Sequence, residues 1–284
     1  MNTAEQAKVL TRALPYIQKY IGKTIVIKYG GNAMKSEELK KAVIEDIVLL
    51  SCVGVRVVLV HGGGPEINEM LNRVGIESKF INGLRYTNAD TIDIVQMVLC
   101  GKINKQLSAL ISEKGGKAMG ISGLDSNLLI AEMIEEKDTD YGYVGNVIDV
   151  DTTIITKALD IGFIPVVATL AKDGNGQALN INADTAAAKI AAALKAERLL
   201  TLTDVAGVLT NSDDPSTLIE EIPVSDVNHL IKEGIIKGGM IPKIDCCVYA
   251  VREGVKNTAI IDGRVPHSIL IEMLSDEGSG TMIF

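Results

Sequence analysis

The chain has 284 residues, a formal net charge of −8 and an apolar fraction of 47%. These values are typical of a globular protein and exclude the disordered, collagen and coiled-coil classes. The acidic balance argues against nucleic acid as the main partner, because neutralising phosphates requires a basic face. No apolar run reaches the roughly 18 residues of a membrane helix. The first residues also lack the basic and apolar regions of a signal peptide, so we expect a cytoplasmic protein.

Residues 1–20 stand apart from the rest of the chain. Apolar side chains recur there at steps of three and four from Ala7 to Ile21, which predicts an amphipathic helix. Pro15 lies inside this segment and should kink the helix. The helix either folds back on its own domain or forms an arm that pairs with another subunit, and the apolar stripe alone does not choose between the two.

From residue 24 onward, the chain repeats the order strand, glycine turn, helix. This alternation predicts parallel strands with right-handed crossovers, and therefore a three-layer αβα sandwich around a mainly parallel open sheet. A β-hairpin is expected over 128–150, with Gly142 and Gly145 as turns, and one long helix from Thr87 or Asn88 to about Gly115. A boundary near 172–177 divides an N-terminal lobe, 21–178, from a C-terminal lobe, 179–284.

Cysteine and histidine are scarce, and no Cys-x-x-Cys pair occurs among the four cysteines. We therefore expect reduced thiols and no metal site built by the protein.

Two predicted strands end in glycine turns, Lys28-Tyr-Gly-Gly31 and His61-Gly-Gly-Gly64. Glycine lets bare N–H groups approach a ligand, and a following helix N-terminus favours an anion. A single loop of this kind would be read as a tight turn, but two at neighbouring strand ends favour phosphate binding. Neither loop matches the P-loop or the Rossmann pattern.

Several polar residues near these loops have two interpretations each. Lys28, at the end of an apolar strand, and Lys243, in the first turn of a helix, are better explained as anion ligands than as surface lysines. Arg85 is either a carboxylate clamp or a solvated loop arginine. Asp184 could simply cap the following helix, and Asn180 and Asn182 could form turns.

Seven short motifs then combine into a known pattern. They are Lys28-Tyr-Gly-Gly31, His61-Gly-Gly-Gly64, Asn82-Gly-Leu-Arg85, Tyr143-Val-Gly-Asn146, Asn180-Ile-Asn-Ala-Asp184, Leu202-Thr-Asp-Val-Ala-Gly207 and Gly238-Gly-Met-Ile-Pro-Lys243. Their order over nearly the whole chain resembles the acetylglutamate kinase family of the amino acid kinase superfamily. The resemblance implies phosphorylation of the γ-carboxylate of N-acetyl-L-glutamate by ATP with Mg²⁺, the second step of arginine biosynthesis. It also implies that the N-terminal lobe binds the amino acid and dimerises, while the C-terminal lobe binds ATP.

The resemblance also assigns roles residue by residue. Lys28, Lys243 and Gly31 would stabilise the transferring phosphoryl group, with Asp184 holding the two lysines. The substrate would be bound by Gly63, Gly64, Arg85, Asn180 and Asn182. ATP would be surrounded by Gly30, Asp204, Val205, Gly207, Val208, Leu209, Ile235, Ile236 and Lys237.

Regulation is implied by the first helix. Arginine-inhibited members of the family resemble this chain in carrying a kinked N-terminal helix, which interlaces dimers into a hexamer. The residues that match the arginine site are Tyr16, Lys195, His267, Glu277, Gly278 and Gly280. A trimeric nitrogen-signalling protein, which docks on related kinases in phototrophs, is a possible partner that the sequence does not decide. Alternatives are another acyl-phosphate kinase, acting on carbamate, aspartate or glutamate, or a non-catalytic arginine sensor.

Overall fold

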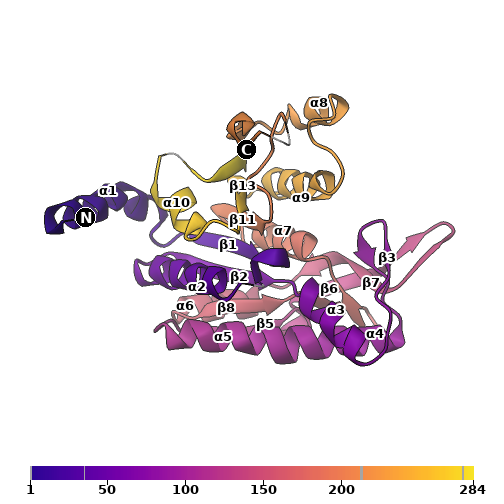
Figure 1. Cartoon of the computed structure of the whole chain (residues 1–284). Helices are drawn as coiled ribbons and strands as arrows, with labels where there is room; N and C mark the ends of the chain where they lie inside the picture. Colours follow the sequence, from indigo (N-terminus) through magenta and orange to yellow (C-terminus); the bar gives the residue numbers. More distant parts are fainter. Residues whose placement is uncertain (1, 35, 212–213, 277) are drawn as a thin grey trace.

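The computed structural model describes residues 2–34, 36–211, 214–276 and 278–284. This part of the chain forms the expected αβα sandwich, with the first helix extending away from the body (Figure 1). None of the described helices has the length and apolarity needed to cross a bilayer.

Among the described residues, the central sheet has eight strands in the order β12-β14-β13-β11-β1-β2-β8-β5. Neighbouring strands run parallel except for the antiparallel pair β13 and β14, so the mainly parallel sheet is confirmed. The strands are β1 (Thr24–Tyr29), β2 (Arg56–His61), β5 (Ala118–Ser122), β8 (Ile164–Ala168), β11 (Arg198–Thr203), β12 (Glu221–Ile222), β13 (Asn257–Asp262) and β14 (Gly280–Ile283). One sheet runs through both predicted lobes, and the division into lobes stays a prediction.

Helices cover both faces of the sheet. One face carries α2 (Glu37–Cys52), α5 (Asn104–Glu113) and α10 (Ser268–Leu274), and the other carries α6 (Thr153–Asp160), α7 (Ala183–Ala193) and α9 (Met240–Arg252). Side chains of β1 alternate between the faces, as the strand repeat requires. Ile25 and Ile27 pack in the core below α2 and α5, while Val26 packs with α6 and α7. Lys28 therefore points to the α7 side.

A small closed barrel lies beside the sheet and was not predicted. It is formed by β6 (Leu129–Glu136), β7 (Thr139–Val150), β9 (Leu170–Lys172) and β10 (Ala178–Asn180). The hairpin over 128–150 is confirmed, but its turn falls between β6 and β7, near Asp138, which has φ +65°. Gly142 and Gly145 lie inside β7, so the prediction that they form the turns was wrong. Gly142 serves close approach instead, because a Cβ there would lie 2.2 Å from the Thr87 carbonyl oxygen.

The long helix after Asn88 has the predicted extent but not the predicted winding. Asn88 caps α4 (Ala89–Gln96), a π-helical segment η2 (Met97–Ile103) follows, and α5 completes the helix. Single π turns inside α-helices are frequent at functional sites.

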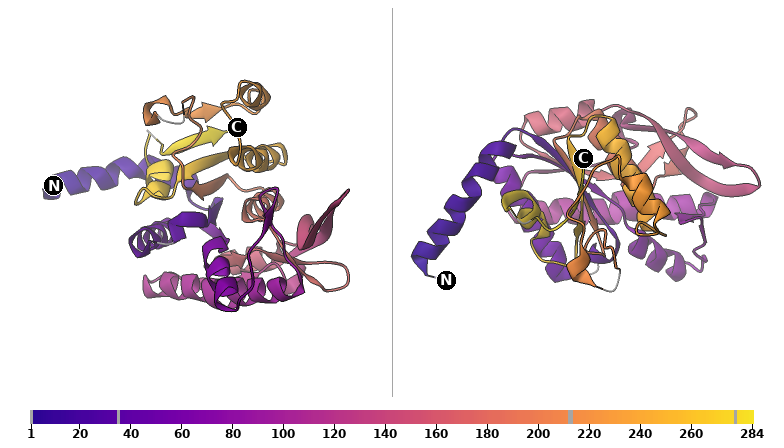
Figure 2. Two further views of the ribbon diagram at one scale, coloured as in Figure 1. Left: turned by 45° about the vertical axis from the view of Figure 1, so that its right-hand side comes forward. Right: turned by 90° about the horizontal axis from the view of Figure 1, so that it is seen from above.

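The first helix, α1 (Thr3–Tyr20), continues through Pro15, and the kink itself stays a prediction. Figure 2 shows α1 projecting from the body in two further views. Tyr20 at its end is buried, whereas Leu14 and Ile21 are 49% and 57% exposed. This chain therefore leaves about half of each of these two apolar side chains uncovered.

The remaining elements are short. They are η1 (Gly31–Met34), α3 (Gly64–Arg73), β3 (Phe80–Ile81), β4 (Leu84–Arg85), η3 (Asp125–Asn127), η4 (Pro215–Thr217) and α8 (Val227–Lys232). Two caps differ from expectation. The sequence indicates Ser225 as the cap of α8, but Asp226 directly precedes that helix. Asn182, not Asp184, caps α7 by accepting from two backbone N–H groups.

Candidate active site

The two glycine loops lie side by side at the carboxyl ends of β1 and β2. These strands pair in parallel with Tyr29 opposite His61, which aligns the turns that follow them. A Cβ built on Gly30 would lie 3.6 Å from the Gly62 nitrogen and 3.7 Å from Lys28 Nζ. The prediction that the loops are neighbours at one sheet edge is therefore confirmed.

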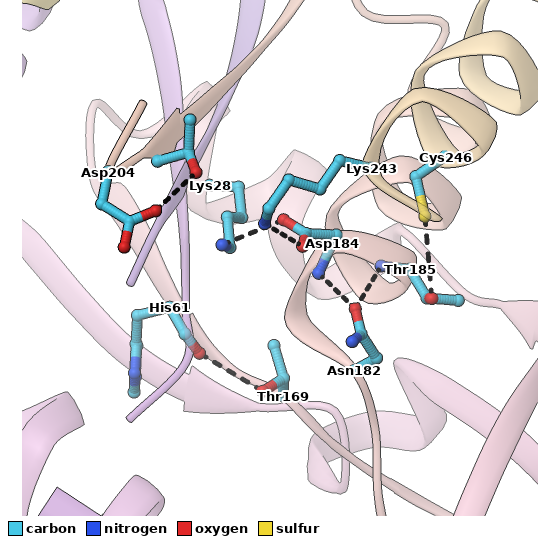
Figure 3. Close-up of polar contacts among 10 residues, drawn as sticks. Lys28, His61, Thr169, Asn182, Asp184, Thr185, Asp204, Lys243 and Cys246 are labelled. Atoms are coloured by element: carbon cyan, nitrogen blue, oxygen red, sulfur yellow. Dashed lines mark hydrogen bonds and ion pairs between the residues drawn. The ribbon is translucent and has the colours of Figure 1, made fainter. Parts of the chain in front are cut away.

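Two lysines meet on one carboxylate beside these loops (Figure 3). Lys28 Nζ forms an ion pair with Asp184 Oδ1 at 2.9 Å, and Lys243 Nζ donates to Asp184 Oδ2 at 2.8 Å. Lys28 comes from strand β1, Asp184 from the first turn of α7 and Lys243 from the first turn of α9. The structure thus brings together Lys28, Lys243 and Asp184, as the resemblance implies, and we call these three residues the clamp.

Asp184 is charged and leaves the cluster with an excess of positive charge. Burial alone would raise the pKa of this carboxyl group, but the charges of Lys28 and Lys243 outweigh burial and lower the pKa. Asn182 fixes the start of α7, because its Oδ1 accepts from the Asp184 and Thr185 backbone nitrogens at 2.9 and 3.2 Å. One carboxylate between two ammonium groups leaves one net positive charge for an anion.

A cavity of about 160 Å³ opens beyond the second glycine loop. Its polar lining includes Arg85, Asn180, Asn182 and Thr169, together with Gly62, Gly63 and Gly64. Asn180 Nδ2 donates to Thr87 Oγ1 at 3.2 Å, which orients the amide. All the residues that the sequence suggested for the substrate are therefore in one place.

Arg85 is buried rather than solvated, so the loop-arginine alternative was wrong. It lies in β4 and is 7% exposed. Its guanidinium donates to Asn68 Oδ1 at 2.6 Å, to Ser78 Oγ, and to the Gly64 carbonyl at 3.2 Å, and it stacks on Phe80. Burial lowers the Arg85 pKa to about 10, which leaves it charged at neutral pH. Because these partners are neutral, the cation remains available to an anionic ligand.

The residues suggested for ATP are spread between surface and core. Asp204, Val205 and Lys237 are exposed. Val208 and Ile236 are buried in a third hydrophobic cluster, so their side chains support this region rather than face a ligand. The rest of the set, Gly30, Gly207, Leu209 and Ile235, lies at strand ends or in the loops between these positions.

Three of the residues suggested for arginine line one pocket of about 280 Å³. They are Tyr16, Gly278 and Gly280, and the Tyr16 hydroxyl donates to Asp276. Lys195 lies elsewhere and donates to the Glu253 carbonyl, and His267 contacts Asp46 on α2. Glu277 lies outside the described residues.

Sequence reasoning missed the residues that support the ligand groups. Asn68 and Ser78 hold Arg85, and Asn104 contacts His61 behind the second glycine loop. No local motif identifies them, because each acts across elements distant in sequence.

Comparison with known proteins agrees with this geometry. The model of the amino acid kinase family matches residues 23–262. Acetylglutamate kinase from Clostridium beijerinckii is 57% identical over 285 residues, covering 100% of both chains. The chain belongs to the amino acid kinase family, among the acetylglutamate kinases.

Several solved structures of other enzymes are similar to this chain. N-acetylglutamate synthase from Neisseria gonorrhoeae, complexed with coenzyme A and N-acetyl-glutamate, is similar with a TM-score of 0.84 and 28% identity over 98% of this chain. This chain spans 63% of that synthase chain. The same synthase with coenzyme A and L-arginine gives a TM-score of 0.79 and 27% identity, over 98% of this chain and 65% of that chain. Carbamate kinase from Giardia lamblia, at 18% identity and a TM-score of 0.65, covers 93% of this chain and 98% of its own, and shares the fold.

Proposed function

We propose that the protein transfers the γ-phosphoryl group of ATP to the γ-carboxylate of N-acetyl-L-glutamate, the second step of arginine biosynthesis. The products are ADP and an acyl phosphate, so the enzyme is a phosphotransferase with a carboxyl acceptor. The observation that carries the proposal is the convergence of Lys28 and Lys243 on Asp184, next to two glycine loops.

The chemistry requires no general base. A glutamate-type carboxylate has a pKa of about 4.3 and is already ionised at neutral pH. Phosphoryl transfer depends on alignment of the reacting groups and on cancellation of the charge that spreads over the transferring group. Lys28 and Lys243 supply positive charge, Gly31 and Gly64 supply backbone N–H groups, and Asp184 holds the lysines. ATP enters as its Mg²⁺ complex.

Arg85 is the residue we assign to the α-carboxylate of the substrate. Its guanidinium is fixed by Asn68 and Ser78 at the wall of the cavity, so little side-chain freedom is lost on binding. Asn180 and Asn182 offer amide groups for the acetylated end, and Gly63 and Gly64 offer N–H groups for the reacting carboxylate. For ATP, the loop from Asp204 to Leu209 follows the carboxyl end of β11, where open α/β sheets bind ligands. The segment from Ile235 to Lys237 joins α8 to α9, and Ile236 packs in one cluster with Val208 of that loop.

Feedback inhibition by L-arginine is a second part of the proposal. Among the described residues, the pocket at Tyr16 is also lined by the carboxylates of Glu220, Glu221, Glu272 and Asp276, against the cations of Lys19 and Arg198. This excess of negative charge suits a guanidinium. The similar synthase structure is complexed with L-arginine, which supports arginine as a ligand for a chain of this fold. The half-exposed Leu14 on α1 and Ile21 just after it support a hexamer in which the helix pairs with another subunit.

The test is ADP release by the purified protein with a panel of acceptors. We expect turnover with N-acetyl-L-glutamate and little with L-glutamate, L-aspartate or carbamate. Strong turnover with carbamate, aspartate or glutamate would identify another acyl-phosphate kinase. Arginine binding without any turnover would identify a sensor.

A further inference from the structure

A buried polar pair, His61 and Asn104, lies behind the second glycine loop and has no part in the proposed chemistry. His61 ends β2, Asn104 begins α5, and the two are 0% and 1% exposed. His61 Nε2 lies 3.2 Å from Asn104 Nδ2, and His61 Nδ1 lies 2.9 Å from the Gly62 carbonyl oxygen. Buried polar groups destabilise a core unless they are bonded, so the contacts of this pair define its role.

The surroundings of Asn104 fix which end of its amide faces His61. Nδ2 also lies 3.0 Å from the Ile121 carbonyl oxygen and 2.8 Å from the Val166 carbonyl oxygen. Carbonyl oxygens accept and cannot donate, so the NH₂ group must face this side. Oδ1 points the other way and accepts from Lys105 Nζ at 3.1 Å. The two N–H groups of this amide face three acceptors, so one N–H is shared, and toward the histidine ring Asn104 can act only as a donor.

The two contacts of the ring determine the tautomer of His61. The Gly62 carbonyl can only accept, so Nδ1 carries the ring proton of the neutral imidazole and donates to it, and Nε2 is left as an acceptor facing the Asn104 amide. Burial lowers the His61 pKa to about 4, so the ring is neutral at physiological pH. The result is a directed chain of hydrogen bonds from Asn104 through His61 to the glycine loop.

The glycine loop gains a fixed orientation from this chain. The Gly62 carbonyl and the Gly63 N–H belong to one planar trans peptide unit, in which they point in opposite directions. Holding the carbonyl against the imidazole directs the Gly63 N–H away from the ring. Gly62 and Gly63 both line the cavity that holds Arg85.

The π-helical segment η2 presses on the same loop. A Cβ on Gly63 would lie 2.2 Å from Ile103 Cδ1 and 2.8 Å from Leu99 Cδ2, so the loop fits tightly against this segment. The segment ends immediately before Asn104. One extra residue in a turn changes the direction of all later side chains by about 100°. The π-helical winding therefore sets both the apolar contacts of Leu99 and Ile103 with Gly63 and the direction of the Asn104 side chain.

We propose that Asn104 and His61 are positioning residues for phosphoryl transfer. They orient the Gly62–Gly63 peptide so that the Gly63 N–H binds the reacting carboxylate of the acceptor. This inference rests on the proposed function, because turnover is the readout. A native protein that releases no ADP with N-acetyl-L-glutamate contradicts the proposed function. If the native protein is active but the variants described below do not differ in kcat as predicted, only this inference is contradicted.

The first experiment compares His61→Asn with His61→Gln. Asparagine places its amide nitrogen near the position of Nδ1 and keeps a donor for Gly62, whereas glutamine places it near Nε2 and loses that donor. We expect kcat within about tenfold of native for His61→Asn and lowered about a hundredfold for His61→Gln, with the KM for ATP unchanged in both. Equal kcat values in the two variants would overturn the proposal.

The second experiment separates positioning from stability. Asn104→Ala removes the donor to His61, and Leu107→Ala on the same helix removes a buried apolar side chain that is 1% exposed. Both variants should lower the thermal midpoint, but only Asn104→Ala should lower kcat, by at least about tenfold. A similar kcat for the two variants would overturn the proposal. If a His61 variant does not fold, this comparison is the deciding test.

Discussion

Lys28 on β1 and Lys243 on α9 bind opposite oxygens of one carboxylate, that of Asp184. Two ammonium groups held this closely would repel each other without an anion between them. Asp184 therefore sets their positions before a ligand binds, and the remaining positive charge is preorganised for the group in transit. Such preorganisation is effective because no reorganisation is needed when charge develops.

Removing either ammonium should slow the chemical step. For Lys28→Ala or Lys243→Ala we expect kcat to fall about a hundred- to a thousandfold, or about 2.7–4 kcal/mol, with a much smaller change in the KM for N-acetyl-L-glutamate. Steady-state kinetics with both substrates varied gives these values. Lys256→Ala is the matched control, since Lys256 is a mostly exposed lysine in a surface ion pair with Glu197. Near-native turnover in either clamp variant would refute its assigned role.

Replacing Arg85 should affect binding more than turnover. A lysine has a single nitrogen in place of the planar guanidinium fork, so it cannot hold Asn68 and Ser78 and also present two parallel N–H groups to a ligand carboxylate. Arg85→Lys should therefore raise the KM for N-acetyl-L-glutamate more than it lowers kcat. Arg56→Lys is the control, because Arg56 begins β2 at the end of the strand opposite to the glycine loop. An unchanged KM in Arg85→Lys would show that Arg85 does not bind the substrate.

Asp46 should make the protein less stable as the pH rises from 4 to 6. Burial raises the pKa of this carboxyl group from 3.8 to about 6, although hydrogen bonding to His267 opposes the shift. In this window the folded state holds a proton that the unfolded state has released, so the free energy of unfolding falls with pH. The side chain is 0% exposed, and the difference amounts to roughly 3 kcal/mol.

Urea unfolding of native protein and Asp46→Asn across this pH range measures the effect. The stability of the variant relative to native should increase from pH 4 to pH 6 and then level off. Subtracting the native curve removes the contributions of titrating groups that do not contact Asp46, including His61, and the measured difference belongs to Asp46 together with its partner His267. A constant difference across the range would show that Asp46 titrates normally in the folded state.

The first helix should link assembly to arginine inhibition. Deleting residues 2–13 leaves Tyr16 and the buried Tyr20 in place but removes most of the arm. We expect a dimer that still phosphorylates N-acetyl-L-glutamate and has lost most of its arginine response. Light scattering and activity measured against arginine concentration report the two properties.

Tyr16→Phe is the companion variant, because it removes only the hydroxyl group that contacts Asp276. It should weaken the proposed arginine inhibition and leave the proposed hexamer intact. A truncated protein that remains hexameric and fully sensitive to arginine would contradict the arm model without affecting the catalytic assignment.

The sequence predicts best the features that depend on local order. Lys28 and His61 could be placed at the sheet edge because apolar strands, glycines and capped helices follow one another directly. The contact of Asp184 with the two lysines could be predicted only from the family resemblance, because no local sequence pattern connects α7 with β1.

Other features depend on packing between distant segments. The π turn before Asn104 has no signal in an ordinary amphipathic pattern, because its winding accompanies the fit of Leu99 and Ile103 against Gly63. The small barrel likewise depends on β9 and β10, which are only three residues long each. Such short strands carry too little periodicity to be recognised in sequence.

The most direct test of the central claim follows oxygen atoms. N-acetyl-L-glutamate labelled with ¹⁸O in its γ-carboxylate is incubated with ATP, Mg²⁺, the protein and hydroxylamine. If a carboxylate oxygen attacks the γ-phosphorus, that oxygen becomes the bridge of the acyl phosphate. Hydroxylamine then attacks the acyl carbon and expels phosphate that retains the bridging oxygen. The account predicts inorganic phosphate carrying a single ¹⁸O together with the γ-hydroxamate, and unlabelled phosphate without hydroxamate would contradict it.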